Sequence, residues 1–93
     1  MRDYYIKLER MILIVENIKK FIYEKLMEMG FLPEEFKNLD EKIYNMKMSS
    51  LEVTDLILTI QETYGIVIQT SDIQQMSLNE LMTKIYKEKY QIE

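Results

Sequence analysis

Helix-breaking residues are rare in this chain, which has only two glycines and one proline among its 93 residues. Good helix formers such as Lys, Glu, Leu, Met and Gln supply much of the rest. Apolar residues make up 47% of the sequence, which is ordinary for a globular domain and too high for a disordered chain. A chain of this length has room for one domain. The sequence therefore predicts a single small all-α domain.

The first helix is predicted to end at Gly30, because glycine tolerates the positive φ that commonly follows a helix. Upstream of it, apolar residues recur at spacings of three and four, which is the pattern of one helix face. This stripe consists of Met11, Val15, Ile18, Ile22, Leu26 and Met29. The sequence leaves the start of the helix open between Asp3 and Leu13.

Residues 31–49 form a long connection, in which Pro33 is expected to open a short helical turn that runs to Phe36. Long connections in compact domains are either functional or disordered. Apolar anchors favour an ordered loop that packs across the helices. The anchors are Phe31, Leu32, Phe36, Leu39, Ile43 and Met46.

Two capping boxes predict the starts of two further helices, with Ser49 at the N-cap and Glu52 at N3 in the first, and Ser77 and Glu80 in the second. Gly65 is expected to end the first of these helices. Its apolar stripe is Val53, Leu56, Ile57, Ile60 and Tyr64. The predicted core residues of the second are Leu78, Leu81, Met82 and Ile85.

The segment between these helices is predicted to hold a short extra helix. Residues 66–68 are β-branched, and we interpret them as an extended segment whose alternate side chains are buried. Thr70 or Ser71 is expected to cap a short helix that includes Ile73 and Met76. The predicted fold is a bundle of three main helices plus one short helix, with a long ordered loop after the first.

The absence of Cys and His limits the chemistry that this chain can perform. Without them there is no disulfide framework and no thiolate metal site, and we predict no metal site. The commonest general base is also missing, and no constellation of acid, base and nucleophile is visible. We therefore predict a protein that is not an enzyme.

The net charge of -4 argues against partners such as nucleic acid or anionic membranes, which attract basic surfaces. The acidity is concentrated in residues 51–76, which contain four acids and no Lys or Arg. The longest apolar run, residues 11–15, is far shorter than the roughly 20 residues of a membrane span and shorter than the core of a signal peptide. A cytoplasmic location is therefore expected.

The stretch from Ser49 to Ile68 resembles the second helix of the acyl carrier proteins, a family that binds phosphopantetheine. The family pattern is Asp-Ser-Leu, then an acid before a Leu, then Glu-x-(Phe/Tyr)-Gly-Ile-x-Ile. The matching segments here are Ser-Ser-Leu at 49–51, Asp-Leu at 55–56 and Glu-Thr-Tyr-Gly-Ile-Val-Ile at 62–68. Residues 76–81 resemble the start of the family's last helix, and the distance from Gly30 to Ser50 fits its long first loop. The chain departs from the pattern at Ser49, where the family usually has Asp.

The resemblance covers residues 15–88, which we interpret as the carrier domain. Residues 1–14 are then an N-terminal extension, helical or loose, and residues 89–93 a frayed tail. The resemblance implies that the hydroxyl of Ser50 carries 4′-phosphopantetheine, whose thiol holds cargo as a thioester, with Ser49 as the helix N-cap beside it. The implied partners are a phosphopantetheinyl transferase, an acyl- or aminoacyl-loading ligase and a downstream synthase or transferase.

The resemblance also implies two groups of contact residues. The acids Glu52, Asp55 and Glu62 would dock on basic patches of partner enzymes. Residues that would line a cavity for the cargo are Met46, Met48, Leu56, Ile60 and Ile73. The cargo stays open among fatty acyl, polyketide and aminoacyl groups, and the departure at Ser49, the extension and the moderate acidity favour a dedicated biosynthetic pathway. We expect a monomer.

Simpler interpretations remain beside these. Ser50 would then be only part of a helix cap, and the chain an unmodified, carrier-like domain that acts in protein–protein interaction. The acids of residues 51–76 would be a solvated face, and the eight Met residues core filler. Four tyrosines near the ends of the chain are interpreted as packing residues or as a docking or dimer surface: Tyr4, Tyr5, Tyr86 and Tyr90.

Overall fold

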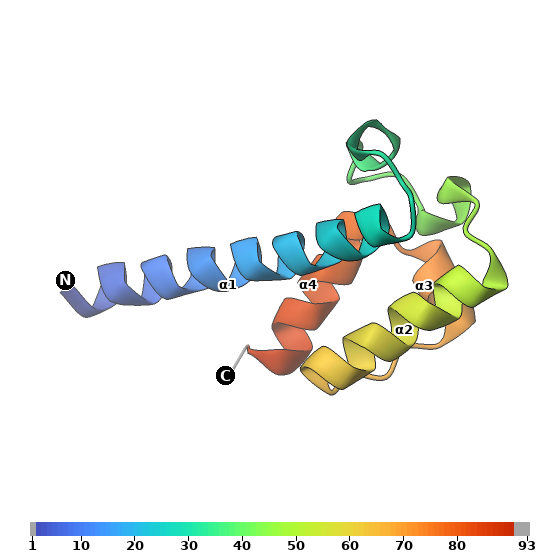
Figure 1. The fold of residues 1–93 in the computed structure, drawn as a ribbon. Coiled ribbons are helices and arrows are strands. Elements are labelled where there is room, and N and C mark those ends of the chain that lie inside the picture. The colour runs from blue at the N-terminus through green and yellow to red at the C-terminus, as the bar shows by residue number, and fades with distance from the viewer. Residues whose placement is uncertain (1, 91–93) are drawn as a thin grey trace.

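The computed structural model describes residues 2–90 and confirms the predicted small all-α fold (Figure 1). Within these residues the chain forms helices and short 3-10 turns and contains no strand. The elements in order are α1 (Arg2–Glu28), η1 (Pro33–Phe36), η2 (Ile43–Met46), α2 (Ser50–Tyr64), α3 (Thr70–Gln75) and α4 (Leu78–Lys89). The predicted frayed tail begins at the last residue of α4, and its residues 91–93 lie outside the described part of the chain.

Helix α1 is continuous from Arg2, so the part of the extension that the structure describes is helical. Its C-terminal half carries Ile18, Ile22 and Leu26, which are fully buried in the core. Met11 and Val15 continue the same periodic stripe but are 45% and 42% exposed. The reason is geometric, since the N-terminal half of α1 runs past the end of the other helices and projects from the bundle (Figure 1).

Helix α1 ends as predicted at a glycine turn. Gly30 has φ 101°, and the N–H of Phe31 donates to the carbonyl of Leu26 at 3.0 Å, five residues back. This is the hydrogen bond of a Schellman motif, which satisfies a carbonyl that the helix would otherwise leave unpaired.

The long loop is ordered and covers the start of α4. Pro33 opens η1, as predicted, whereas η2 was not predicted. The N–H of Ile43 donates to the carbonyl of Met76 at 2.8 Å, and the N–H of Asn79 donates to the carbonyl of Leu39 at 3.0 Å. Phe36 and Ile43 are buried anchors, but Leu32 is exposed at the N-cap of η1 and is not the anchor that the sequence suggested.

Both predicted capping boxes are present, at Ser49 before α2 and at Ser77 before α4. Helix α2 ends at Gly65, which has φ 73°. Its buried residues are Val53, Leu56, Ile60 and Tyr64, and Ile57 is half-buried at the edge of the stripe. Those of α4 are Leu78, Leu81, Met82 and Ile85.

The predicted cap of the short helix is wrong, because α3 is preceded by Gln69 rather than capped by Thr70 or Ser71. The carbonyl of Gln69 accepts the N–H groups of Asp72 and Ile73 at 3.1 and 3.0 Å, which places both hydroxyl residues inside the helix. Before α3, residues 66–68 are extended as predicted, with Ile66 and Ile68 buried and Val67 exposed. Met76 is the C-cap and lies just beyond the helix.

Within residues 2–90, no helix combines the length and the apolar character that crossing a bilayer requires.

Candidate functional site

The start of α2 is an exposed, fully formed capping box. The N–H of Ser49 donates to Oε1 of Glu52 at 2.8 Å, and the N–H of Glu52 donates to Oγ of Ser49 at 3.2 Å. Ser49 itself is in the extended region (φ -68°, ψ 164°), as an N-cap residue must be. The two reciprocal bonds fix the direction in which the chain enters the helix.

Ser50 is the first residue of α2, and its side chain is exposed. A helix leaves its first four N–H groups without intrahelical acceptors, and the capping box supplies acceptors for those of Ser49 and Glu52. The N–H groups of Ser50 and Leu51 remain without an intrahelical acceptor. The Ser50 hydroxyl is therefore exposed to solvent and lies beside two backbone donors and the positive end of the helix dipole. These features favour the binding of a phosphate.

A strip of alternating leucines and acids runs along the outer face of α2 from this point. Leu51, Asp55, Leu58 and Glu62 follow one another at four-, three- and four-residue steps, so they share one face of the helix. Leu51 is 82% exposed and Leu58 51% exposed. The two acids were predicted as docking residues from the sequence, but the two leucines were not. Leu51 and Leu58 could have been found from their seven-residue spacing, which places two apolar residues on the same helix face, away from the buried stripe.

The structure places the three candidate docking acids in different environments. The carboxylate of Glu52 is held by the capping box, and Glu62 is exposed on the outer strip. Oδ2 of Asp55 lies 2.9 Å from Nζ of Lys25 in α1, which also lies 3.2 Å from Oε1 of Glu28. Residues 51–76 contain no cation of their own, but the fold brings Lys25 of α1 against their Asp55.

The ion pair with Asp55 stabilises the charged form of Lys25. Its side chain is only 13% exposed. The hydrogen bond to the carboxylate of Asp55 raises the pKa of Lys25 above its ordinary value of 10.5, and burial opposes this rise. Lys25 is therefore a cation throughout the physiological range, and a basic partner of α2 meets an acid that is already paired.

One predicted cavity residue lies at a pocket close to the start of α2. Met48 lines a pocket of about 370 Å³ between η2, the start of α2 and α3, together with Val53 and Gln74. Met46 is half-buried on η2. The other three candidates, Leu56, Ile60 and Ile73, are fully buried in the core.

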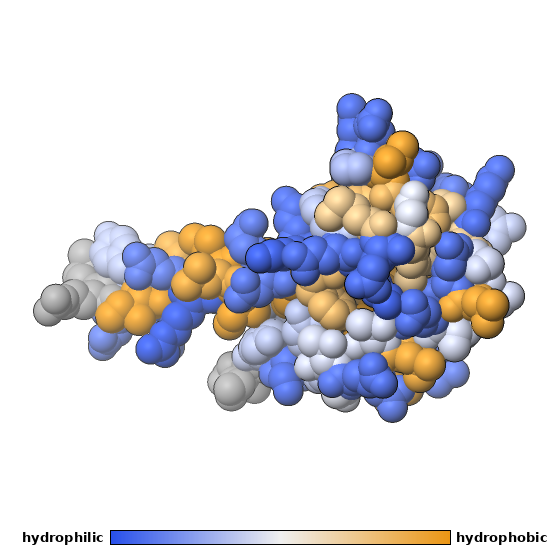
Figure 2. Space-filling view, in the orientation of Figure 1, coloured by the Kyte–Doolittle hydropathy of each residue, from blue (hydrophilic) through white to orange (hydrophobic). Residues whose placement is uncertain are grey.

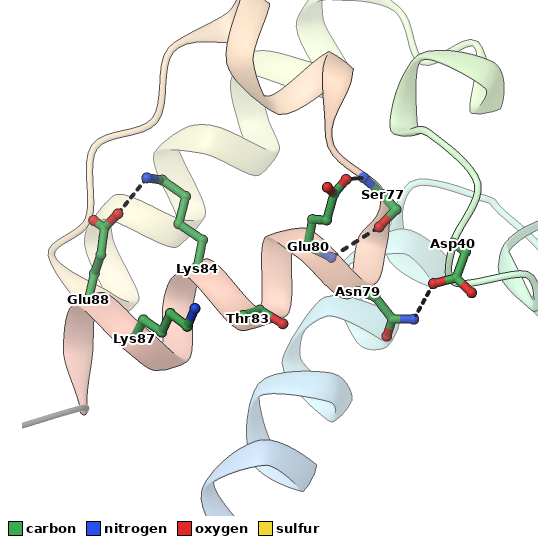
Figure 3. Close-up of a pocket in the computed structure, with 8 residues that line it drawn as sticks. All are labelled: Asp40, Ser77, Asn79, Glu80, Thr83, Lys84, Lys87 and Glu88. Atoms are coloured by element: carbon green, nitrogen blue, oxygen red, sulfur yellow. Dashed lines mark hydrogen bonds and ion pairs between the residues drawn. The ribbon is translucent and has the colours of Figure 1, made fainter.

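A wider, open depression of about 670 Å³ runs along α4 and meets the long loop (Figure 3). Its polar groups are largely engaged with one another. Glu80 closes the second capping box, Nδ2 of Asn79 donates to Oδ1 of Asp40 at 2.7 Å, and Lys84 pairs with Glu88. These contacts are structural, and the start of α2 remains the better candidate site.

The fold and this site define a class: a small helical domain that presents an exposed serine at the start of its second main helix. Comparison with known protein families matches residues 27–85 to the family described as the phosphopantetheine attachment site. The match spans more than half of the chain, and the protein belongs to this family. Comparison with curated proteins and with solved structures gives no significant match. Members of the family are carrier domains, generally non-catalytic, that work with transferases and synthases.

Proposed function

We propose that this protein is an acyl or aminoacyl carrier and that Ser50 is its attachment point for 4′-phosphopantetheine. The single observation that carries the proposal is the exposed Ser50 hydroxyl at the first position of α2, inside the region that matches the family. When bound, the cofactor supplies a thiol at the end of a flexible arm, on which cargo is held as a thioester.

The residues around Ser50 fit a phosphodiester. The unpaired N–H groups of Ser50 and Leu51 are positioned to bind the phosphate. The Glu52 carboxylate is turned back to the N–H of Ser49, so it is held by a donor instead of facing the phosphate freely. During attachment by a separate transferase, the Oγ–phosphorus bond forms, the anhydride bond of coenzyme A breaks with 3′-phosphoadenosine 5′-phosphate as the leaving group, and the hydroxyl proton passes to a base of that enzyme. The chain itself supplies the nucleophile and no catalytic group.

We further propose that the outer strip of α2, together with Glu52, is the docking face for partner enzymes. Leu51 and Leu58 offer apolar contact on either side of Asp55, and Glu62 extends the strip toward the end of the helix. Charged contacts of this kind accelerate association and weaken as salt is added. Because Lys25 already pairs with Asp55, the apolar contacts of the leucines should carry more of the binding than the acids do.

The cavity proposed for the cargo centres on Met48. The pocket that it lines opens beside the start of α2, within reach of an arm attached at Ser50. Leu56, Ile60 and Ile73 would reach a cargo only if the core beneath this pocket opened. A dedicated biosynthetic pathway remains our proposal for the setting, on the grounds given by the sequence.

The decisive experiment is the intact mass of the protein after incubation with coenzyme A and a broad-specificity phosphopantetheinyl transferase. We expect a gain of one phosphopantetheine that disappears completely in Ser50→Ala. The matched control is Ser49→Ala, which removes the neighbouring hydroxyl and weakens the cap but leaves the nucleophile, so it should still be modified. Modification of Ser50→Ala, or no gain with several transferases, would contradict the proposal and favour an unmodified interaction domain.

A further inference from the structure

The projecting half of α1 carries a continuous apolar stripe that its own bundle leaves uncovered. At about 100° per residue, the stripe spans roughly 120° of the helix surface between Tyr4 and Val15, with no charged side chain in it. Its exposed fractions run from 40% to 65%. The stripe consists of Tyr4, Tyr5, Leu8, Met11, Ile12 and Val15. Apolar residues are visible along the projecting part of α1 in the space-filling view (Figure 2).

The uncovered face of α1 is the part of the helix that a partner would stabilise. Most helical stability in proteins comes from packing an apolar face. The projecting half of α1 has such a face, and within residues 2–90 no other helix packs along it (Figure 1). We propose that the partner is a second copy of this chain, which pairs antiparallel with the projecting half of α1.

The exposed area of the stripe reaches the lower limit for a dimer interface. If each of the six side chains offers about 200 Å², as an aromatic side chain does, their exposed parts present at most roughly 600 Å² per chain. Two copies would then bury about 1,200 Å², which is the lower limit of specific, stable interfaces.

The antiparallel direction follows from the position of the bundle. The face that holds Val15 continues into Ile18 and Ile22, which are buried against the same chain's bundle. A parallel second copy on this face would drive its own bundle into the first one. An antiparallel copy sends the two bundles to opposite ends, and a two-fold axis makes the contact self-complementary.

The antiparallel pair also fills a groove between α1 and α4. This groove has a volume of about 250 Å³, and Val15, Ile18, Met82 and Tyr86 contribute to its lining. A shallower groove along Leu8, Met11 and Ile12 joins it, because both are lined by Val15 and Glu16. With the axis between residues 9 and 10, Leu8 lies opposite Met11 of the second copy, and Tyr4 lies opposite Val15 at the mouth of the α1–α4 groove.

Sedimentation equilibrium of the whole chain tests the association. We expect twice the mass of one chain, falling to the monomer on dilution. Ile12→Glu puts a charge into the stripe and should raise the dimer dissociation constant by roughly 100-fold. Leu13→Glu is the matched control, because Leu13 is 62% exposed and lies outside the stripe, and it should leave the dimer intact. A monomer at all concentrations, or equal effects of the two variants, would overturn the proposal.

Disulfide cross-linking tests whether the two copies of α1 pair antiparallel. Because the sequence has no native Cys, each introduced Cys can link only to another introduced Cys. Leu8→Cys mixed with Met11→Cys should give the crossed dimer. Tyr4→Cys alone should not link to itself, because antiparallel pairing separates the two copies of position 4 by about 16 Å, beyond the reach of a disulfide. Efficient self-linking of Tyr4→Cys would overturn the antiparallel arrangement, and a monomer that binds anionic vesicles through the stripe would overturn the dimer.

This inference does not depend on the modification of Ser50, since Ser50→Ala should dimerise like the native chain. The proposed dimer differs from the monomer expected from the sequence. It uses Tyr4 and Tyr5, two of the four tyrosines for which a dimer surface was considered there.

Discussion

The helices α2 and α4 begin with the same capping box, but the two starts differ in their first helical residue and in what packs against them. Each begins with a serine N-cap and a glutamate at N3, and in each the serine N–H donates to the glutamate Oε1 at 2.8 Å. At α2 the capping serine, Ser49, is exposed. At α4 it is Ser77, which is 3% exposed and covered by the long loop.

The first helical residue differs accordingly. At α2 it is Ser50, whose hydroxyl faces solvent, and at α4 it is Leu78, which is 1% exposed and belongs to the core. The long loop accounts for the difference in exposure, because two backbone hydrogen bonds, one on each side of Ser77, hold it over the start of α4. Both capped helix starts therefore have the local geometry that favours a phosphate. Tertiary packing covers the start of α4 and leaves the start of α2 exposed.

The largest effect is expected when the serine is moved from the start of α2 to the start of α4. Leu78→Ser in the Ser50→Ala background places a hydroxyl at the corresponding position of a capped helix. We expect no phosphopantetheine gain by intact mass, because a transferase cannot reach position 78. Loss of the buried leucine should also lower the free energy of unfolding by about 3 kcal/mol, measured by urea denaturation.

The outcome of this transplant distinguishes local sequence from exposure. Modification at position 78 in a variant that remains folded by circular dichroism would mean that the local sequence alone directs the transferase. Ser50→Ala alone serves as the reference for both the mass and the stability.

A smaller effect separates the two caps themselves. Ser49→Ala should cost about 1 kcal/mol of unfolding free energy, the usual value of an exposed N-cap. Ser77→Ala should cost about 2 kcal/mol, because it leaves the N–H of Glu80 without its acceptor in a covered site. Urea denaturation of the two variants side by side measures the difference. Equal costs would show that the loop contributes nothing to the strength of the second cap.

Local features of this fold could be predicted from the sequence, because a few neighbouring residues determine them. The boxes at Ser49 and Ser77 and the turns at Gly30 and Gly65 all formed where expected. Each depends on contacts within about five residues, which the sequence displays directly. The buried stripes of α2 and α4 followed from helical periodicity for the same reason.

Features that depend on distant residues could not be predicted. Val15 and Ile18 belong to one periodic stripe, but only the second lies within the bundle, and periodicity does not reveal where a bundle ends. The pairing of Lys25 with Asp55 joins residues that are thirty positions apart. The difference between the starts of α2 and α4 is of the same kind, since it depends on where the long loop lies.

The smallest expected effect concerns two titratable groups where α1 meets α2, Lys25 and Tyr64. The bond to Asp55 raises the pKa of Lys25, and burial, with a smaller contribution from nearby Tyr90, raises the pKa of Tyr64 above its ordinary value of 10.0. Both groups hold their protons more tightly in the folded state than in the unfolded chain. The free energy of unfolding should therefore be insensitive to these groups below about pH 10 and fall as the pH rises through the raised pKa values.

Urea denaturation between pH 8 and pH 11 measures this fall. Lys25→Met should cost only about 0.5 kcal/mol at neutral pH, because Asp55 is 54% exposed and solvent weakens the pair. Lys25→Arg keeps a cation beside Asp55 at high pH and, together with Tyr64→Phe, should flatten the alkaline fall. An undiminished fall in that double variant would show that the alkaline instability arises elsewhere. A flattened fall would show that the alkaline instability arises where α1 meets α2.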